Sequence, residues 1–243
     1  MIEVEQLSKS YGPREAIKNL SFQIEKGEVV GFLGPNGAGK STTMNILSCI
    51  IPASSGNAKI CGFDVFEQSL EIRKLIGYLP ETPPLYLDMV VHDYLTFAAR
   101  LRGIRSKETA SAVDQVAGKC SLKGVESRII GRLSKGYQQR VGIAQALIHD
   151  PDILILDEPT IGLDPIQIIE IRKLIQELAS SHTIILSSHI LPEITQICKR
   201  VIIINDGEIA AVDSLESLTT RLRKGERLLL QVRQSDNTTI EKL

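Results

Sequence analysis

Residues 34–41 read Gly34-Pro35-Asn36-Gly37-Ala38-Gly39-Lys40-Ser41, and this stretch decides the fold of the chain. It fits the pattern G-x-x-x-x-G-K-[ST], which forms a phosphate-binding loop when a strand precedes it and a helix follows it. The apolar run over residues 29–33 is typical of a buried strand, and residues 42–47 are typical of a helix. The sequence therefore predicts a strand, a phosphate-binding loop and a helix, in that order.

The composition of this loop suits the binding of a polyphosphate. Glycines let the backbone wrap closely around the ligand, and the following helix N-terminus adds roughly half a positive charge. We expect Lys40 to reach the β- and γ-phosphates and the Ser41 hydroxyl to ligate Mg²⁺. A glycine-rich turn that binds nothing is the alternative, but it leaves the flanking strand and helix unexplained. The nucleotide-binding residues predicted from the motif are Gly34, Pro35, Asn36, Gly37, Ala38, Gly39, Lys40, Ser41 and Thr42.

The overall composition is typical of a soluble protein of 243 residues, enough for one large α/β domain or a domain with a small lobe. Its apolar runs are far shorter than the roughly 20 residues of a membrane helix, and its start does not resemble a signal peptide. A net charge of -1 gives no general attraction to nucleic acid. The four cysteines form no C-x-x-C pair, so we expect reduced, mostly buried thiols.

The order of elements predicts how the domain is organised. Strands are expected at residues 2–7 and 16–25, and with the strand at 29–33 they suggest an antiparallel flap before a parallel core. From about 85 to 150 the pattern is helical, which predicts an inserted helical lobe. Further elements are expected as a strand pair at 58–65, helices at 67–75, 93–102, 106–119, 134–148, 165–179 and 191–199, strands at 76–79, 153–157 and 183–186, and a hairpin over 201–212.

The C-terminal residues, 221–243, form a separate tail in this interpretation. Residues 228–232 are typical of a strand, yet only a short stretch of chain follows them. Such a strand would be a poorly protected sheet edge unless it pairs with the main body. Two interpretations stay open: the tail starts a further domain, or this strand pairs with the rest of the chain.

A second motif places two carboxylates beside the phosphate-binding loop. Asp157 and Glu158 follow the apolar run at 153–156. A carboxylate at the end of a buried strand can hold Mg²⁺ through water, which we assign to Asp157. Glu158 would then act as general base or orient the attacking water. Alone, the pair could be the polar end of a strand; the upstream loop favours the catalytic interpretation.

A third motif reads Leu133-Ser134-Lys135-Gly136-Tyr137-Gln138-Gln139-Arg140 and begins a helix capped by Ser134. With these motifs in order, the sequence resembles an ATP-binding cassette (ABC) nucleotide-binding domain, whose signature reads L-S-G-G-Q. The resemblance covers about residues 1–220. It implies an α/β fold with a P-loop NTPase core and parallel sheet, an N-terminal antiparallel β subdomain and an inserted α-helical subdomain. Lys135 and Tyr137 depart from the signature, while Ser134 and Gly136 keep the positions expected to contact the γ-phosphate.

The resemblance also implies a site shared by two chains. In this family two domains pack head to tail, so Ser134 and Gly136 of one subunit close over the phosphate-binding loop of the other. Tyr11 matches the aromatic residue that stacks on adenine, His189 the switch histidine at the γ-phosphate, and Asp164 the residue that crosses the dimer interface. Taken singly, these three could be a turn tyrosine, a structural histidine and a helix cap.

One position departs from the family pattern. Where the family usually has a glutamine that touches Mg²⁺ and the attacking water, this chain has Glu81. A carboxylate can ligate Mg²⁺ but cannot donate an amide hydrogen bond. The expected metal ligands are therefore Ser41, Glu81 and Asp157. The stretch Tyr78-Leu79-Pro80-Glu81 resembles that of bacterial export-type members paired with ABC-2 permeases, including gliding-motility and multidrug or antibiotic efflux systems.

The resemblance implies an ATPase subunit that binds ATP and Mg²⁺ and drives a separate membrane permease, with Glu158, His189 and Lys40 as catalytic residues. Its expected partners are that permease and a second ATPase subunit, in a homodimer or heterodimer, with no nucleic acid. It would be cytoplasmic and peripheral on the inner face of the membrane. Two alternatives stay open: a soluble ABC ATPase in DNA repair, chromosome organisation or translation, and a regulator with little turnover.

Overall fold

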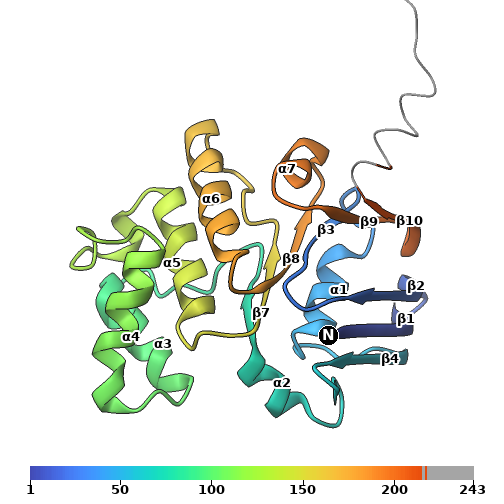
Figure 1. Cartoon of the computed structure of the whole chain (residues 1–243), viewed down its shortest axis with the longest axis horizontal. Helices are drawn as coiled ribbons and strands as arrows, with labels where there is room; N and C mark the ends of the chain where they lie inside the picture. The colour runs from blue at the N-terminus through green and yellow to red at the C-terminus, as the bar shows by residue number, and fades with distance from the viewer. Residues whose placement is uncertain (215–216, 218–243) are drawn as a thin grey trace, which may run out of the picture.

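The structure is a computed structural model that describes residues 1–214 and 217. The chain contains two β-sheets, and the strands of the smaller one lie at the right of Figure 1. The smaller sheet has the order β2-β1-β4-β5, with β1 at Ile2–Tyr11, β2 at Arg14–Ile24, β4 at Ser55–Ile60 and β5 at Phe63–Asp64. The larger has the order β10-β9-β3-β8-β7-β6, with β3 at Val29–Leu33, β6 at Ile76–Leu79, β7 at Ile153–Asp157, β8 at Thr183–Ser188, β9 at Arg200–Asn205 and β10 at Glu208–Ser214. The expected tail strand lies outside the described residues.

The larger sheet is a parallel core closed by one hairpin. Strands β9, β3, β8, β7 and β6 are parallel neighbours, and β10 pairs antiparallel with β9. The predicted hairpin turn is confirmed at Asp206 and Gly207, which both have positive φ, as a two-residue turn between twisted strands requires. Strand β7 is buried along its whole length, because it lies between β6 and β8 and is covered on both faces.

Side chains of the parallel strands alternate between two hydrophobic cores. Ile153 and Ile155 of β7 pack in a core with the antiparallel sheet and the helix after the phosphate-binding loop. Leu154 and Leu156 face the other way and pack with the helical part of the chain. Because side chains alternate in direction along a strand, β7 packs against both cores. It ends at Asp157, directly before Glu158.

The helices are α1 Lys40–Leu47, α2 Ser69–Leu75, α3 Val91–Leu101, α4 Ser106–Lys119, α5 Lys135–Leu147, α6 Pro165–Leu178 and α7 Leu191–Thr195, with a 3-10 turn at Ile130–Arg132. Helices α3, α4 and α5 contact one another and lie on the side of the molecule opposite the antiparallel strands (Figure 1). This grouping agrees with a helical lobe at about 85–150, although the division into subdomains stays a prediction.

Several expectations about single elements were wrong. The strand at 29–33 is not part of the antiparallel flap, because β3 hydrogen-bonds β8 and β9 in the parallel sheet; the strand pair near residue 60 takes its place beside β1. The helix expected at 93–102 begins earlier, at Val91. The helix expected at 191–199 ends at Thr195, because Cys198 packs close to Gly31 and the chain then reverses into β9.

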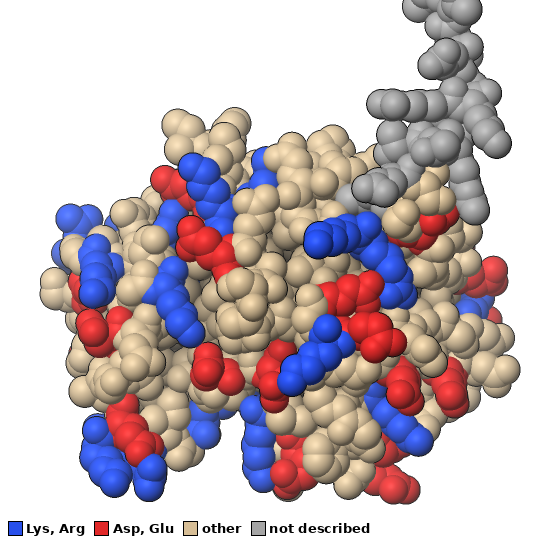
Figure 2. All heavy atoms as spheres, viewed as in Figure 1, with Lys and Arg blue, Asp and Glu red and all other residues tan. Residues whose placement is uncertain are grey.

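The exposed surface carries charges of both signs. On the face seen in Figure 2, lysine and arginine side chains are interspersed with aspartate and glutamate. Within the described part of the chain, none of the helices combines the length and apolarity needed to cross a bilayer.

Candidate functional site

The loop between β3 and α1 is pressed against neighbouring backbone, so its glycines are required. A Cβ on Gly34 would lie 2.3 Å from the carbonyl oxygen of Ile204. Gly39 has φ 106°, and a Cβ there would lie 2.6 Å from the carbonyl oxygen of Ala16. Both positions exclude a side chain, one by close approach and the other also by its left-handed backbone. The loop is thereby held between β2 and β9.

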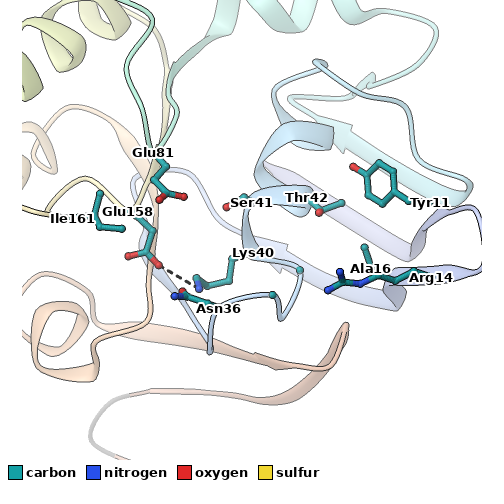
Figure 3. Close-up of a pocket in the computed structure, with 12 residues that line it drawn as sticks. Tyr11, Arg14, Ala16, Asn36, Lys40, Ser41, Thr42, Glu81, Glu158 and Ile161 are labelled. Atoms are coloured by element: carbon teal, nitrogen blue, oxygen red, sulfur yellow. Dashed lines mark ion pairs between the residues drawn. The ribbon is translucent and has the colours of Figure 1, made fainter.

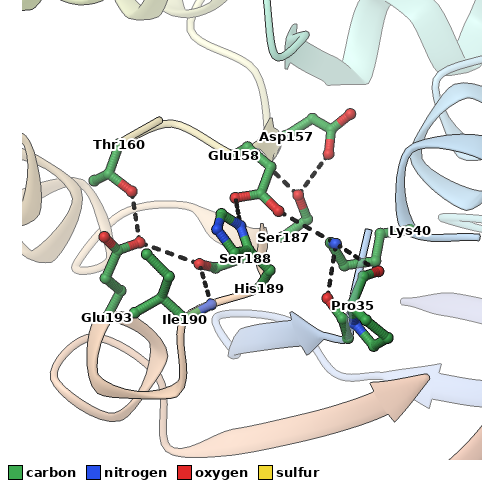
Figure 4. Close-up of polar contacts among 11 residues, drawn as sticks. Pro35, Lys40, Asp157, Glu158, Thr160, Ser187, Ser188, His189, Ile190 and Glu193 are labelled. Carbon is green, nitrogen blue, oxygen red and sulfur yellow. Dashed lines mark hydrogen bonds and ion pairs between the residues drawn. The ribbon is translucent and has the colours of Figure 1, made fainter. Parts of the chain in front are cut away.

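Lys40, the first residue of α1, lies buried beneath this loop. Its Nζ donates to the carbonyl oxygens of Gly34 at 2.8 Å and Pro35 at 3.2 Å. The same nitrogen lies 3.3 Å from Oε1 of Glu158, and both side chains are almost fully buried. The phosphate-binding loop and the end of β7 are therefore joined by an ion pair (Figure 4).

The two carboxylates after β7 point to different partners. Asp157 is buried and accepts a short hydrogen bond from the Ser187 hydroxyl of β8. The same Ser187 oxygen accepts from the backbone N–H of Glu158 at 2.9 Å. Glu158 has φ 47°, a left-handed conformation that turns its side chain out of the strand direction. As a result, Asp157 stays within the sheet while Glu158 faces the phosphate-binding loop.

His189 completes a row of three ionisable side chains. Its Nδ1 lies 3.0 Å from Oε2 of Glu158. Glu158 therefore has Lys40 on one carboxylate oxygen and His189 on the other (Figure 4). A carboxylate oriented from both sides in this way suits the handling of a proton or a water molecule.

A pocket of about 510 Å³ is lined by Lys40 and Glu158 of this row. Tyr11 stands at one end, Glu81 and Glu158 stand at the other, and the phosphate-binding loop runs between them (Figure 3). This order matches a nucleoside triphosphate, with a ring for the base at one end and oxygen ligands at the other. The pocket is lined by Tyr11, Arg14, Ala16, Asn36, Gly37, Gly39, Lys40, Ser41, Thr42, Glu81, Glu158 and Ile161.

Comparisons with known proteins identify the family. A model described as ABC transporter matches residues 17–161. The chain belongs to the ABC transporter family. The bacitracin transport ATP-binding protein BcrA of Bacillus licheniformis is 40% identical over 226 residues, which cover 92% of this chain and 73% of that protein. The ABC transporter ATP-binding protein NatA of Bacillus subtilis (strain 168) is 40% identical over 207 residues, 84% of each.

A solved structure confirms the ABC ATPase fold expected from the sequence. The dimeric structure of a post-hydrolysis state of the ATP-binding cassette MJ0796, bound to ADP and Pi, superposes with a TM-score of 0.80 at 26% identity. The match covers 88% of this chain and 99% of that chain. This chain is accordingly the ATP-binding and ATP-hydrolysing subunit of an ABC transporter.

The signature residues of this ABC subunit lie away from its own pocket. Ser134 caps α5 and accepts from the backbone N–H of Tyr137 at 3.5 Å, and a Cβ on Gly136 would meet the Gln167 side chain of α6. Asp164 caps α6 and accepts from the N–H of Gln167 at 2.9 Å. None of the three lines the pocket described above. The structure thus brings together Tyr11, the phosphate-binding loop, Glu81, Glu158 and His189, but not Ser134, Gly136 or Asp164.

The oxygen ligands of the pocket fit a magnesium ion. Ser41 and Glu81 line it, whereas Asp157, which directly precedes Glu158 in the chain, does not. Among the described residues, no three His, Cys, Asp or Glu side chains form a preformed metal cluster. Mg²⁺ usually binds through one or two carboxylates together with substrate phosphates and water. The small number of protein oxygen ligands at this site is therefore consistent with Mg²⁺.

Two residues at the site were missed in the sequence. Ser187 joins Asp157 to the backbone of Glu158, and the only signal was its place in a Ser-Ser-His run at a strand end. Arg14 lines the pocket beside the phosphate-binding loop, with Nη2 3.7 Å from where a Gly37 Cβ would stand. No ion pair or hydrogen bond of its side chain occurs within residues 1–214 and 217. A cation three residues after Tyr11 could have indicated a phosphate contact.

Proposed function

We propose that this ATPase subunit drives a separate membrane permease, acting as one of two ATPase subunits on the cytoplasmic face of the membrane. The observation that carries the proposal is the Glu158 carboxylate, held between Lys40 and His189 at the phosphate end of the pocket. A carboxylate in this position suits ATP hydrolysis, because it can accept a proton from the attacking water or orient it. A regulator with little turnover would not need this arrangement.

In this proposal the side chains divide the work of hydrolysis. Tyr11 stacks on the adenine, and the loop amides with Lys40 hold the phosphates. Glu158 accepts a proton from, or orients, the attacking water, and His189 fixes the direction of the Glu158 carboxylate. Mg²⁺, held by Ser41, Glu81 and Asp157, would neutralise phosphate charge.

We further propose that each pocket is half of a site. Ser134 and Gly136 open α5, where capping and the helix dipole favour an anion, yet they do not line the pocket of their own chain. A second subunit packed head to tail would bring these residues over the phosphates and Asp164 across the interface. ATP would then join the two subunits, and hydrolysis would release them. Both homodimers and heterodimers satisfy this arrangement.

A groove beside α2 and α3 suits the permease. It has a volume of about 870 Å³ and is lined by residues that include Ile50, Arg73, Leu101 and Arg102. Arg73 and Arg102 donate to the backbone carbonyls of Cys49 and Arg73 and, within the described residues, form no ion pair. Exposed apolar side chains beside two such cations match an amphipathic helix that bears a carboxylate.

The direction of transport is proposed from the relatives. BcrA is a bacitracin transport protein, and an export role for this chain agrees with the Tyr78-Leu79-Pro80-Glu81 stretch. The relatives are transporter subunits, which favours transport over a soluble role in DNA repair, chromosome organisation or translation.

The experiment is the Glu158→Gln variant, which keeps the shape of the side chain and removes its charge. It should bind ATP as the parent does, lose at least about 100-fold in turnover, and form a dimer in ATP with Mg²⁺. Light scattering after size exclusion would measure the dimer, with ADP as the control nucleotide. Normal turnover in this variant would remove Glu158 from the mechanism.

A further inference from the structure

Helix α7 is short and mostly exposed, yet it buries one carboxylate. Leu191 and Thr195 of this helix face solvent, whereas Glu193 is only 8% exposed. Among residues 1–214 and 217, no lysine, arginine or histidine lies within ion-pair distance of Glu193. Burying a carboxylate without a cation is costly unless hydrogen bonds compensate for the lost water. The partners of Glu193 should therefore explain why it is there.

Those partners come from the two segments that carry Glu158 and His189. Oε2 of Glu193 accepts from the Thr160 hydroxyl at 2.6 Å and from the Ser188 hydroxyl at 3.1 Å (Figure 4). Thr160 lies two residues after Glu158, and Ser188 directly precedes His189. One buried oxygen thus joins the segment leaving β7 to the end of β8.

Further hydrogen bonds extend this connection in both directions. The Ser188 hydroxyl accepts from the Ile190 N–H at 3.0 Å, and the Ser188 carbonyl accepts from the Gly34 N–H of the phosphate-binding loop at 3.3 Å. Beyond Thr160 the chain turns, with the Leu163 N–H bonded to the Thr160 carbonyl, and reaches Asp164 at the start of α6. The Glu193 carboxylate therefore lies where these segments meet.

From this geometry we propose that Glu193 is a positioning residue for ATP hydrolysis. It holds Thr160 and Ser188 together, and so fixes the distance between the Glu158 carboxylate and the His189 imidazole. It touches no reacting atom itself. The proposal rests on the function proposed above, because it assigns to Glu193 the orientation of Glu158 and His189 for that reaction.

Two substitutions at position 193 separate positioning from bulk packing. Glu193→Met keeps an unbranched side chain of similar length and removes the acceptor, whereas Glu193→Gln keeps a carbonyl oxygen that can accept from both hydroxyls. For Glu193→Met we expect kcat to fall about 10- to 100-fold while the Kd for ATP changes less than about twofold, because a small displacement at the reacting groups affects the chemical step. For Glu193→Gln, kcat should stay within about threefold of the parent.

Thr160→Val tests the same contact from the other side. It removes one of the two donors without a large change in volume, so its loss of kcat should be smaller than that of Glu193→Met. Adding it to Glu193→Met should cost nothing further, because Glu193→Met already removes the hydrogen bond that Thr160→Val removes. Thr195→Val is the matched control on α7. Among the described residues the Thr195 hydroxyl bonds only the Pro192 carbonyl of the same helix, so this variant should leave kcat unchanged.

Purified full-length variants would be compared by steady-state ATPase assay, nucleotide binding and thermal unfolding. If Glu193→Met does not fold, Thr160→Val and Ser188→Ala decide the matter. A kcat near that of the parent in the variants lacking the contact, or a kcat as low in Glu193→Gln as in Glu193→Met, overturns the proposal. The Glu158→Gln variant runs in parallel: if it turns over normally the proposed function fails, whereas its inactivity beside a fully active Glu193→Met overturns only the role of Glu193.

Discussion

Lys40 supports both nucleotide binding and the stability of the folded chain, so its removal should have two separable effects. The Lys40 ammonium lies beside the buried Glu158 carboxylate, at 3.3 Å, and His189 supplies the other contact. Lys40→Met would leave that carboxylate with His189 alone. Removing one partner of a buried ion pair lowers the free energy of unfolding by about 3–5 kcal/mol. Because the pocket is open to water, we expect about 3 kcal/mol for Lys40→Met.

The same substitution should weaken ATP binding. A hydrogen bond to a charged group contributes about 1.5–3 kcal/mol, so the loss of Lys40 should raise the Kd for ATP roughly 10- to 150-fold. Urea unfolding without nucleotide would measure the first effect, and isothermal titration with ATP and Mg²⁺ the second.

A double variant separates these effects. Adding Glu158→Gln to Lys40→Met removes the uncompensated carboxylate, so at least half of the lost stability should return, while ATP affinity should stay low. Lys18→Met is the control, because within the described part of the chain the Lys18 side chain forms a single ion pair, with Glu208, far less buried than that of Lys40. The reasoning is refuted if Lys40→Met unfolds at the parent's urea concentration, or if Glu158→Gln restores no stability to it.

Three further variants test the rest of the pocket and one distant histidine. Arg14→Ala should weaken ATP and ADP binding about tenfold and adenosine binding hardly at all, because its guanidinium lies beside the phosphate-binding loop; titrations with the three ligands check this. Glu81→Gln should raise the Mg²⁺ concentration for half-maximal turnover about threefold or more, since one anionic ligand is lost. Burial lowers the pKa of His149 from 6.5 to about 4, with Arg102 adding to the effect. The neutral form is therefore favoured by folding. About 3 kcal/mol of stability, fully present above pH 6.5, should be lost as the pH falls from 6.5 to 4. In His149→Gln the free energy of unfolding should change less than in the parent over this pH range, as urea unfolding at each pH would measure.

The fold could be predicted where a sequence motif and the pattern of apolar residues around it indicate the same elements. The strand, loop and helix around Lys40 and the fully apolar β7 were predictable because a buried parallel strand and a phosphate-binding loop impose strong local demands. The sheet to which β3 belongs was not predictable, because strand pairing is decided by partners far away in the sequence.

The candidate site was predictable only as far as its motifs reached. The structure brings Glu158 and His189 together from strands β7 and β8, as the order of motifs indicated. Glu193 and Arg14 carry no motif of their own. A glutamate on a short helix and an arginine on a strand are ordinary surface residues in a sequence, and only the packing of α7 and the turn after Tyr11 bring them to the site.

The central claim is that ATP is hydrolysed between two chains, and a mixing experiment tests it most directly. Lys40→Met and Ser134→Arg should each be inactive alone, one through its phosphate-binding loop and the other through its signature. When the two variants are mixed with ATP and Mg²⁺, the account predicts that turnover reappears, because the intact loop of one chain meets the intact signature of the other. No recovery on mixing, with both variants folded and associating with each other, would contradict it.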